Sequence, residues 1–116
     1  MNPAVWVGVG GIIGALARHA VGQRIEREHG DTFAVNVLGS FLLGAVVAAP
    51  IEEPITLALG TGFCGAFTTF STFAFETVRL YEDGRRRRAI VNAAGHLVAA
   101  LIAVGVATVI VGLLVS

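Results

Sequence analysis

The chain has 116 residues, of which 55% are hydrophobic and 14% are charged, and its formal net charge is zero. With a mean hydropathy of +0.80, a soluble domain of this length would expose too much apolar surface to stay dispersed, so the composition predicts one membrane domain. The single cysteine, Cys64, excludes an intrachain disulfide, and because no metal-ligand spacing surrounds it we expect a small buried side chain.

Four apolar segments follow one another along the chain, at residues 3–21, 33–51, 54–75 and 89–115. Each is close to the roughly 20 residues that cross about 30 Å of hydrocarbon as a helix. No basic region precedes the first segment, so we expect it to remain as a span. The sequence therefore predicts an all-α membrane protein with four transmembrane helices and both termini on one side.

Small residues recur at four-residue spacing within three of the segments. The pairs are Gly10 with Gly14, Ser40 with Gly44, and Ala58 with Gly62. Such pairs let helix backbones approach closely in lipid, although glycine and alanine are also abundant in ordinary membrane helices. We expect tight packing within the bundle, or against a second copy or a partner.

All eight basic residues belong to the first and third connections or their flanks: Arg18, Arg24, Arg27, Arg79, Arg85, Arg86, Arg87 and Arg88. The turn between the second and third spans carries only Glu52 and Glu53. The positive-inside rule then predicts a plasma-membrane protein with cytoplasmic loops one and three, and with the termini outside. The arginines at 85–88 are interpreted as a topology anchor, with an anionic-lipid or nucleic-acid contact as the alternative; we expect no nucleic acid partner.

Three polar side chains in or near the spans have two interpretations each. Arg18 reaches the cytoplasmic surface, attracts anions into a vestibule, or does both. The amide of Asn36 bridges helices or meets an anion, and His96 is bonded within the bundle or acts as a ligand or proton carrier. No span has a central carboxylate, which argues against proton-coupled or cation-coupled transport. Without a phosphate loop, a Ser-His-Asp set or a Cys/His cluster, an enzyme is not expected.

The third span departs most from a lipid-facing helix. Between residues 60 and 73, glycines and hydroxyls interleave with four phenylalanines, Phe63, Phe67, Phe70 and Phe73. Polar donors and irregular backbone at membrane depth are tolerated where they face protein or a water-filled path. A break at the glycines would free carbonyls for a cation, while neutral donors and ring edges suit a small dehydrated anion. The rings form one stripe if the helix is continuous, and ordinary packing is the alternative interpretation of that stripe.

Three motifs together resemble the Fluc-type fluoride channels, also called the CrcB family, over nearly the whole chain. They are GGIIGA at 10–15 with Arg18, VNVLGSF at 35–41, and GFCG at 62–65 followed by TTFSTF at 68–73 with Glu76. The resemblance implies a passive, fluoride-selective channel that exports cytoplasmic fluoride and lowers its toxicity. It also implies an antiparallel dimer with two pores and a broken third helix.

The resemblance assigns the anion pore to five positions. Asn36 matches a pore-lining amide, and Phe70 and Phe73 match paired phenylalanines whose ring edges contact fluoride. Ser71 and Thr72 match a polar track.

Two further features follow from the resemblance alone. Arg18 matches a basic residue near the cytoplasmic vestibule. A structural Na⁺ is implied on the dimer axis, bound by the backbone carbonyls of Gly65 and Thr68 from both subunits.

The chain departs from the family in two respects. Asn92 and His96 stand where many members have a tyrosine and a serine in the fourth helix. The loop charge is strongly biased, whereas single-gene members are nearly balanced, so we expect an obligate heterodimer with a homologous subunit of opposite topology. The alternatives are a poorly conducting structural subunit of such a heterodimer, or a small four-span multidrug or cation antiporter. The antiporter would need a carboxylate in the first span, and residues 3–17 contain none.

Overall fold

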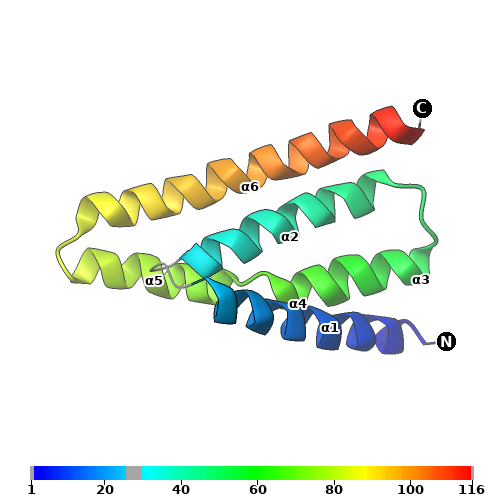
Figure 1. The fold of residues 1–116 in the computed structure, drawn as a ribbon, viewed down its shortest axis with the longest axis horizontal. Helices are drawn as coiled ribbons and strands as arrows, with labels where there is room; N and C mark the ends of the chain where they lie inside the picture. The colour runs from blue at the N-terminus through cyan, green and yellow to red at the C-terminus, as the bar shows by residue number, and fades with distance from the viewer. Residues whose placement is uncertain (1, 26–29, 116) are drawn as a thin grey trace.

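A computed structural model describes residues 2–25 and 30–115, and within these ranges it is helical without any strand (Figure 1). Four helices are long and apolar enough to cross a membrane: α1 (Pro3–Arg24), α2 (Gly30–Ala48), a composite third helix (Glu53–Glu82) and α6 (Arg86–Val115). The predicted fold class, four transmembrane helices with an interrupted third, is therefore confirmed. Arg27, counted above among the loop arginines, lies outside the described residues.

The third helix consists of four pieces. A short α3 (Glu53–Thr56) leads into a π-helix, η1 (Leu57–Cys64), then into one turn of α-helix, α4 (Gly65–Phe67). Thr68 and Thr69 then adopt extended backbone conformations, with ψ of 163° and 115°, before α5 (Phe70–Glu82) begins. The break expected at the glycines thus lies just after them, at Thr68 and Thr69, while η1, which contains Gly60 and Gly62, stays helical but widened.

Two threonine hydroxyls define the two sides of the break. The Thr68 hydroxyl and amide both donate to the Cys64 carbonyl oxygen, at 2.8 and 3.0 Å, and so complete the last turn of α4. Thr69 is the N-cap of α5, because its Oγ1 accepts a hydrogen bond from the amide of Thr72 at 3.2 Å. The chain therefore ends one helix and starts the next within two residues.

Glycines bring α1 and η1 into backbone contact. A Cβ atom at Gly10 would collide with the carbonyl oxygen of Ala58, and one at Gly14 would collide with that of Phe63. On the opposite side of this contact, a Cβ at Gly62 would lie 2.5 Å from the Val7 oxygen. The tight packing predicted for these small residues is confirmed, since only hydrogen fits between the two helices.

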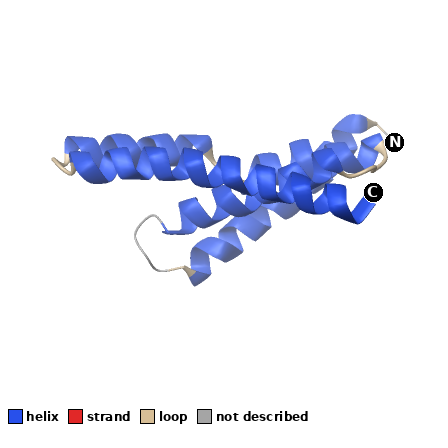
Figure 2. Ribbon diagram, turned by 90° about the horizontal axis from the view of Figure 1, so that it is seen from above, coloured by secondary structure: helices blue, strands red, loops and turns tan. Residues whose placement is uncertain are grey.

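The turn between α5 and α6 lies at the opposite end of the bundle from both termini. In Figure 1 this turn is at the far left, both termini and α3 are at the right, and the end of α1 and the start of α2 lie between them. Arg85 to Arg88 follow the turn, which makes this the arginine-bearing end. The α5–α6 turn uses Gly84 at φ 82°, a left-handed conformation that suits glycine. Figure 2 shows the α1–α2 pair diverging from the α5–α6 pair at the arginine-bearing end.

Candidate functional site

Asn36 on α2 binds the break in the third helix with both ends of its amide. Its Oδ1 accepts from the Thr69 amide at 2.8 Å, and its Nδ2 donates to the Thr69 carbonyl oxygen at 3.2 Å. In an unbroken α-helix, the Thr69 amide would donate to the carbonyl of Gly65 four residues earlier. Asn36 takes that donor, so the side chain bridges two helices and also stabilises the extended backbone.

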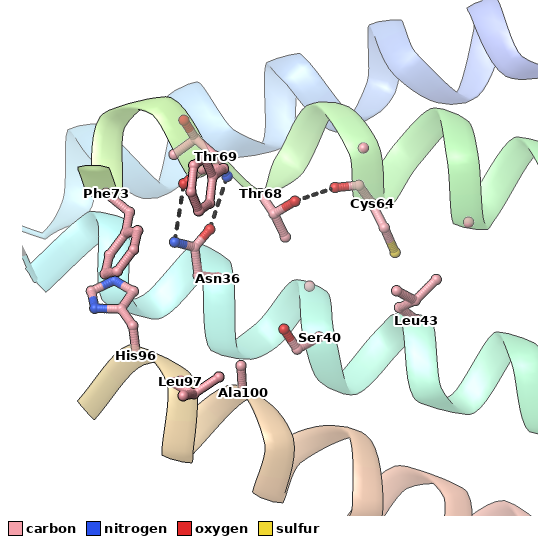
Figure 3. A pocket seen from close by; sticks show the side chains of 14 residues that line it. Asn36, Ser40, Leu43, Cys64, Thr68, Thr69, Phe73, His96, Leu97 and Ala100 are labelled. Carbon is pink, nitrogen blue, oxygen red and sulfur yellow. Dashed lines mark hydrogen bonds between the residues drawn. The ribbon is translucent and has the colours of Figure 1, made fainter. Parts of the chain in front are cut away.

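A central cavity of about 410 Å³ lies beside this break, between α2, the third helix and α6. It is lined by the amide of Asn36, by the break itself and by the rings of Phe70, Phe73 and His96 (Figure 3). Gly65 and Thr68 line it as well, so both predicted cation-binding residues border the same space as Asn36, Phe70 and Phe73 of the predicted anion pore.

The four phenylalanines of the third span form two pairs instead of one stripe. Phe63 and Phe67 stack before the break with ring centroids 5.3 Å apart, whereas Phe70 and Phe73 lie after it at 5.8 Å. The extended residues Thr68 and Thr69 separate the two pairs along the chain. Phe70 is 79% exposed, while Phe73 packs at 4.6 Å on His96 of α6.

A polar cavity of about 330 Å³ lies on the α1 side of the break. Arg18 lines it together with Asp31, Thr32, Thr69 and Thr72. Thr69 lines the central cavity too, so the threonine at the break separates the two spaces. Its hydroxyl donates to the hydroxyl of Thr72 at 3.0 Å, which forms a short chain of hydroxyls from the break toward Arg18.

A third, basic cavity of about 740 Å³ opens at the arginine-bearing end. Arg87 and Arg88 of α6 line it with Phe33 of α2 and Leu80 of α5. His96 lines both this basic cavity and the central cavity.

The fourth-helix residues that depart from the family pattern are both bonded. The Nδ2 atom of Asn92 donates to the hydroxyl of Thr77 at 2.8 Å, and that hydroxyl donates to the Phe73 carbonyl at 2.9 Å. The Nδ1 atom of His96 lies 3.0 Å from the Asn92 carbonyl oxygen. Asn92 therefore joins α6 to α5 through Thr77, whose hydroxyl binds the backbone of Phe73.

One buried contact was missed by sequence reasoning. The hydroxyl of Thr32, which is 3% exposed, donates to Oε1 of Glu76 at 2.6 Å and joins α2 to α5. The available signal was spacing, because Thr32 precedes Asn36 by one helical turn and so shares its face of α2.

Not all of the predicted pore residues lie together. Asn36, Phe70 and Phe73 line the central cavity, whereas Thr72 and Arg18 line the polar cavity. Ser71 is exposed and lines none of the three cavities described here. Cys64 is buried, as expected, and lines the central cavity as a small apolar side chain.

The chain is similar to the members of one protein family. The family model described as CrcB-like protein, Camphor Resistance (CrcB), matches residues 5–113. The chain is 54% identical over 101 residues to "Fluoride-specific ion channel FluC 2" of Natronomonas pharaonis, with 87% of each chain covered. It is 46% identical over 109 residues to the FluC 2 of Haloarcula marismortui, with 92% of each covered. It is 40% identical over 116 residues to the FluC 1 of Halobacterium salinarum, and this alignment covers 98% of this chain and 94% of the relative.

Proposed function

This chain belongs to the CrcB family, and we propose that it is a fluoride-selective ion channel through which cytoplasmic fluoride leaves the cell passively. It is a multi-pass membrane protein and not an enzyme. Loss of fluoride from the cytoplasm lowers its toxicity there. An inside-negative potential drives an anion outward by about 2.3 kcal/mol per 100 mV, so a selective path is sufficient without coupling to another ion.

The observation that carries the proposal is the break at Thr68–Thr69, fixed by Asn36 and opening onto the central cavity. An anion that loses its hydration shell needs hydrogen-bond donors or positive ring edges in place of water. Phe70 and Phe73 supply ring edges at this cavity, and Asn36 supplies the N–H group that does not donate to the Thr69 carbonyl. None of the residues that line this cavity is an aspartate or a glutamate, so no negative side chain there opposes an anion.

The approach from the cytoplasm is assigned to the polar cavity. Arg18 provides positive charge there, and the hydroxyls of Thr72 and Thr69 lead from it to the break. Ser71 extends the exposed hydroxyl face of α5 next to Thr72 and belongs to this polar track when a second subunit covers it. The narrow spacing of donors would admit fluoride and reject the larger chloride.

We also propose that a structural Na⁺ binds to the backbone at the break. Hard cations favour oxygen ligands, including backbone carbonyls. Because Asn36 takes the amide of Thr69, that amide does not serve the Gly65 carbonyl as it would in a continuous helix. We assign the carbonyls of Gly65 and Thr68 as ligands from each of two subunits, so that the ion would join the subunits at their broken helices.

We further propose that the functional unit is an antiparallel heterodimer with a homologous subunit. All arginines of the described residues lie in or near the α1–α2 and α5–α6 connections, which favours one insertion orientation with these connections in the cytoplasm. The numbered names FluC 1 and FluC 2 among the relatives fit the existence of paired paralogues.

Fluoride efflux from liposomes tests the proposal. The chain is reconstituted with a homologue of opposite loop charge, and release of fluoride and of chloride is followed with ion-selective electrodes. We expect fast fluoride release, little chloride release, and little of either from the chain alone. Absence of fluoride release with the partner would contradict the channel, whereas strong release by the chain alone would contradict only the heterodimer. Slow release with one functional pore would favour the poorly conducting subunit.

A further inference from the structure

His96 occupies an unusual position between two cavities. It is 5% exposed, and it lines both the central cavity and the basic cavity. Phe33 of α2 packs on it edge-to-face at 5.2 Å, and Phe73 of α5 packs on it at 4.6 Å with a 44° tilt. Figure 3 shows the ring against Phe73, on the α6 side of the central cavity. The imidazole therefore separates the phenylalanine-lined space from the arginine-lined one.

The hydrogen bonds of His96 leave one ring nitrogen unused. The Nδ1 atom lies 3.0 Å from the Asn92 carbonyl oxygen, and since a carbonyl can only accept, Nδ1 carries a proton. The other nitrogen, Nε2, is buried and has no hydrogen-bond partner among the described residues. A buried polar atom without a partner is costly, so its retention calls for a ligand or a function.

With Nδ1 protonated, the charge of the ring decides what Nε2 offers. The neutral ring presents a lone pair, which repels an anion, whereas the imidazolium presents an N–H donor and a positive charge. An anion can bind Nε2 only in the second state. Arg87 and Arg88, on the same helix, line the basic cavity together with His96. The helices that pack on the ring carry the carboxyl groups of Glu76 on α5 and Asp31 on α2.

We propose that Nε2 of His96 is a fluoride subsite that takes up the anion together with one proton, and that it links the basic cavity to the central cavity. This inference rests on the proposed channel function and deepens it. The imidazolium and the bound fluoride together contain the same atoms as a neutral imidazole and HF. Binding of fluoride with one proton therefore leaves the net charge of the site unchanged. His96 is buried, and a net charge is costly to bury, so the site favours such neutral loading.

The first test is the pH dependence of fluoride efflux, with wild type and His96→Gln compared in liposomes with the partner subunit. Release is measured between about pH 6 and about pH 8, the range over which histidine ordinarily changes charge, and the rate from protein-free liposomes is subtracted to remove HF leakage. We expect wild-type flux to rise several-fold toward acidic pH. The glutamine amide keeps a donor at every pH, so the variant should show a flat profile.

Glu76→Gln serves as a charge control for the same experiment. If the slope came from this neighbouring carboxyl, Glu76→Gln would abolish it and His96→Gln would retain it. A wild-type profile without slope, or the same slope in wild type and His96→Gln, overturns the inference.

The second test does not depend on conduction. Protein with ¹⁵N-labelled histidine in detergent is titrated with sodium fluoride at fixed pH, and the ring nitrogen signal missing from His96→Gln identifies His96. We expect fluoride, but not chloride, to move this signal toward the imidazolium position and to draw about one proton per site from a weakly buffered solution. If the channel conducts fluoride but the His96 nitrogen signal does not shift, the subsite is overturned and the channel function is not. Absence of fluoride flux at every pH would instead contradict the proposed channel function.

Discussion

Asn36 and Thr69 are joined through both ends of the asparagine amide, across 33 residues of sequence. One side chain on α2 thus satisfies the amide and the carbonyl of the residue at which the third helix is interrupted. The same amide lines the central cavity with Phe70 and Phe73. Asn36 can therefore bridge two helices and also face an anion in the cavity.

Replacing Asn36 should affect stability and flux together. In Asn36→Asp, the oxygen that replaces Nδ2 would face the Thr69 carbonyl oxygen, and its charge would repel fluoride. In Asn36→Ala both bonds are lost, at a cost of about 1–3 kcal/mol for a buried group left unpaired. We expect near-background efflux from both variants and a lower unfolding temperature. Leu38→Ala, at an exposed position of the same helix, is the control; wild-type flux in Asn36→Asp would contradict the assignment.

Replacement of Phe70 and of Phe73 should lower fluoride flux in both cases but protein stability in only one. Phe70→Ile and Phe73→Ile should each lower fluoride efflux several-fold, because isoleucine has no positive ring edge. Only Phe73→Ile should also lower the unfolding temperature, since Phe73 packs on His96 whereas Phe70 is 79% exposed. Phe75→Ile is the matched control on the same helix. Unchanged flux in both variants would remove these rings from the pore.

The contact between Thr32 and Glu76 should stabilise the bundle. Thr32→Val keeps the shape but removes the hydroxyl that binds the carboxyl group at 2.6 Å, so we expect a loss of about 1–3 kcal/mol in unfolding free energy. Thr32→Ser keeps the donor and should lose much less. The measurement is thermal or denaturant unfolding in detergent; equal stability of the valine and serine variants would show that the hydrogen bond contributes little.

Two glycines of α1 provide a matched pair for the packing of α1 on η1. Gly10→Ala places a methyl group against the Ala58 carbonyl and should separate the two helices, with poor recovery of folded protein. Gly8→Ala meets nothing within 4 Å and should be neutral or stabilising, by up to about 1 kcal/mol from helix propensity. The yield and elution profile in detergent report the difference. Similar behaviour of both variants would mean that the close contact is not required.

Sodium should stabilise the assembled channel if the carbonyls of Gly65 and Thr68 bind it. A ligand at 100 times its dissociation constant stabilises the state that binds it by about 2.7 kcal/mol. Replacing Na⁺ with N-methylglucamine at constant ionic strength should therefore lower the unfolding temperature and the dimer fraction. Unfolding curves that do not change across a Na⁺ titration would rule out a structural sodium site.

The break in the third helix was predicted from the sequence in kind but not in exact position. Its glycines and hydroxyls marked residues 60–73 as unsuited to lipid, because composition is a local property. The glycines did not break the helix where it was expected; Gly62 instead fits against α1 within a π-helix, and the interruption falls at the two threonines. That position depends on Asn36, which reaches the third helix only after the bundle has packed.

The sequence by itself determined the four apolar helices, the placement of arginines at one end and the chemistry of the third span. These follow from hydropathy, charge and side-chain type, which each segment carries without its neighbours. The tertiary structure decided which polar groups meet. Thr32 reaches Glu76 across 44 residues. His96 packs against rings from two other helices, and its Nε2 atom has no hydrogen-bond partner in the described part of the chain. Such contacts depend on the rotation and crossing of packed helices, and one-dimensional periodicity does not contain that information.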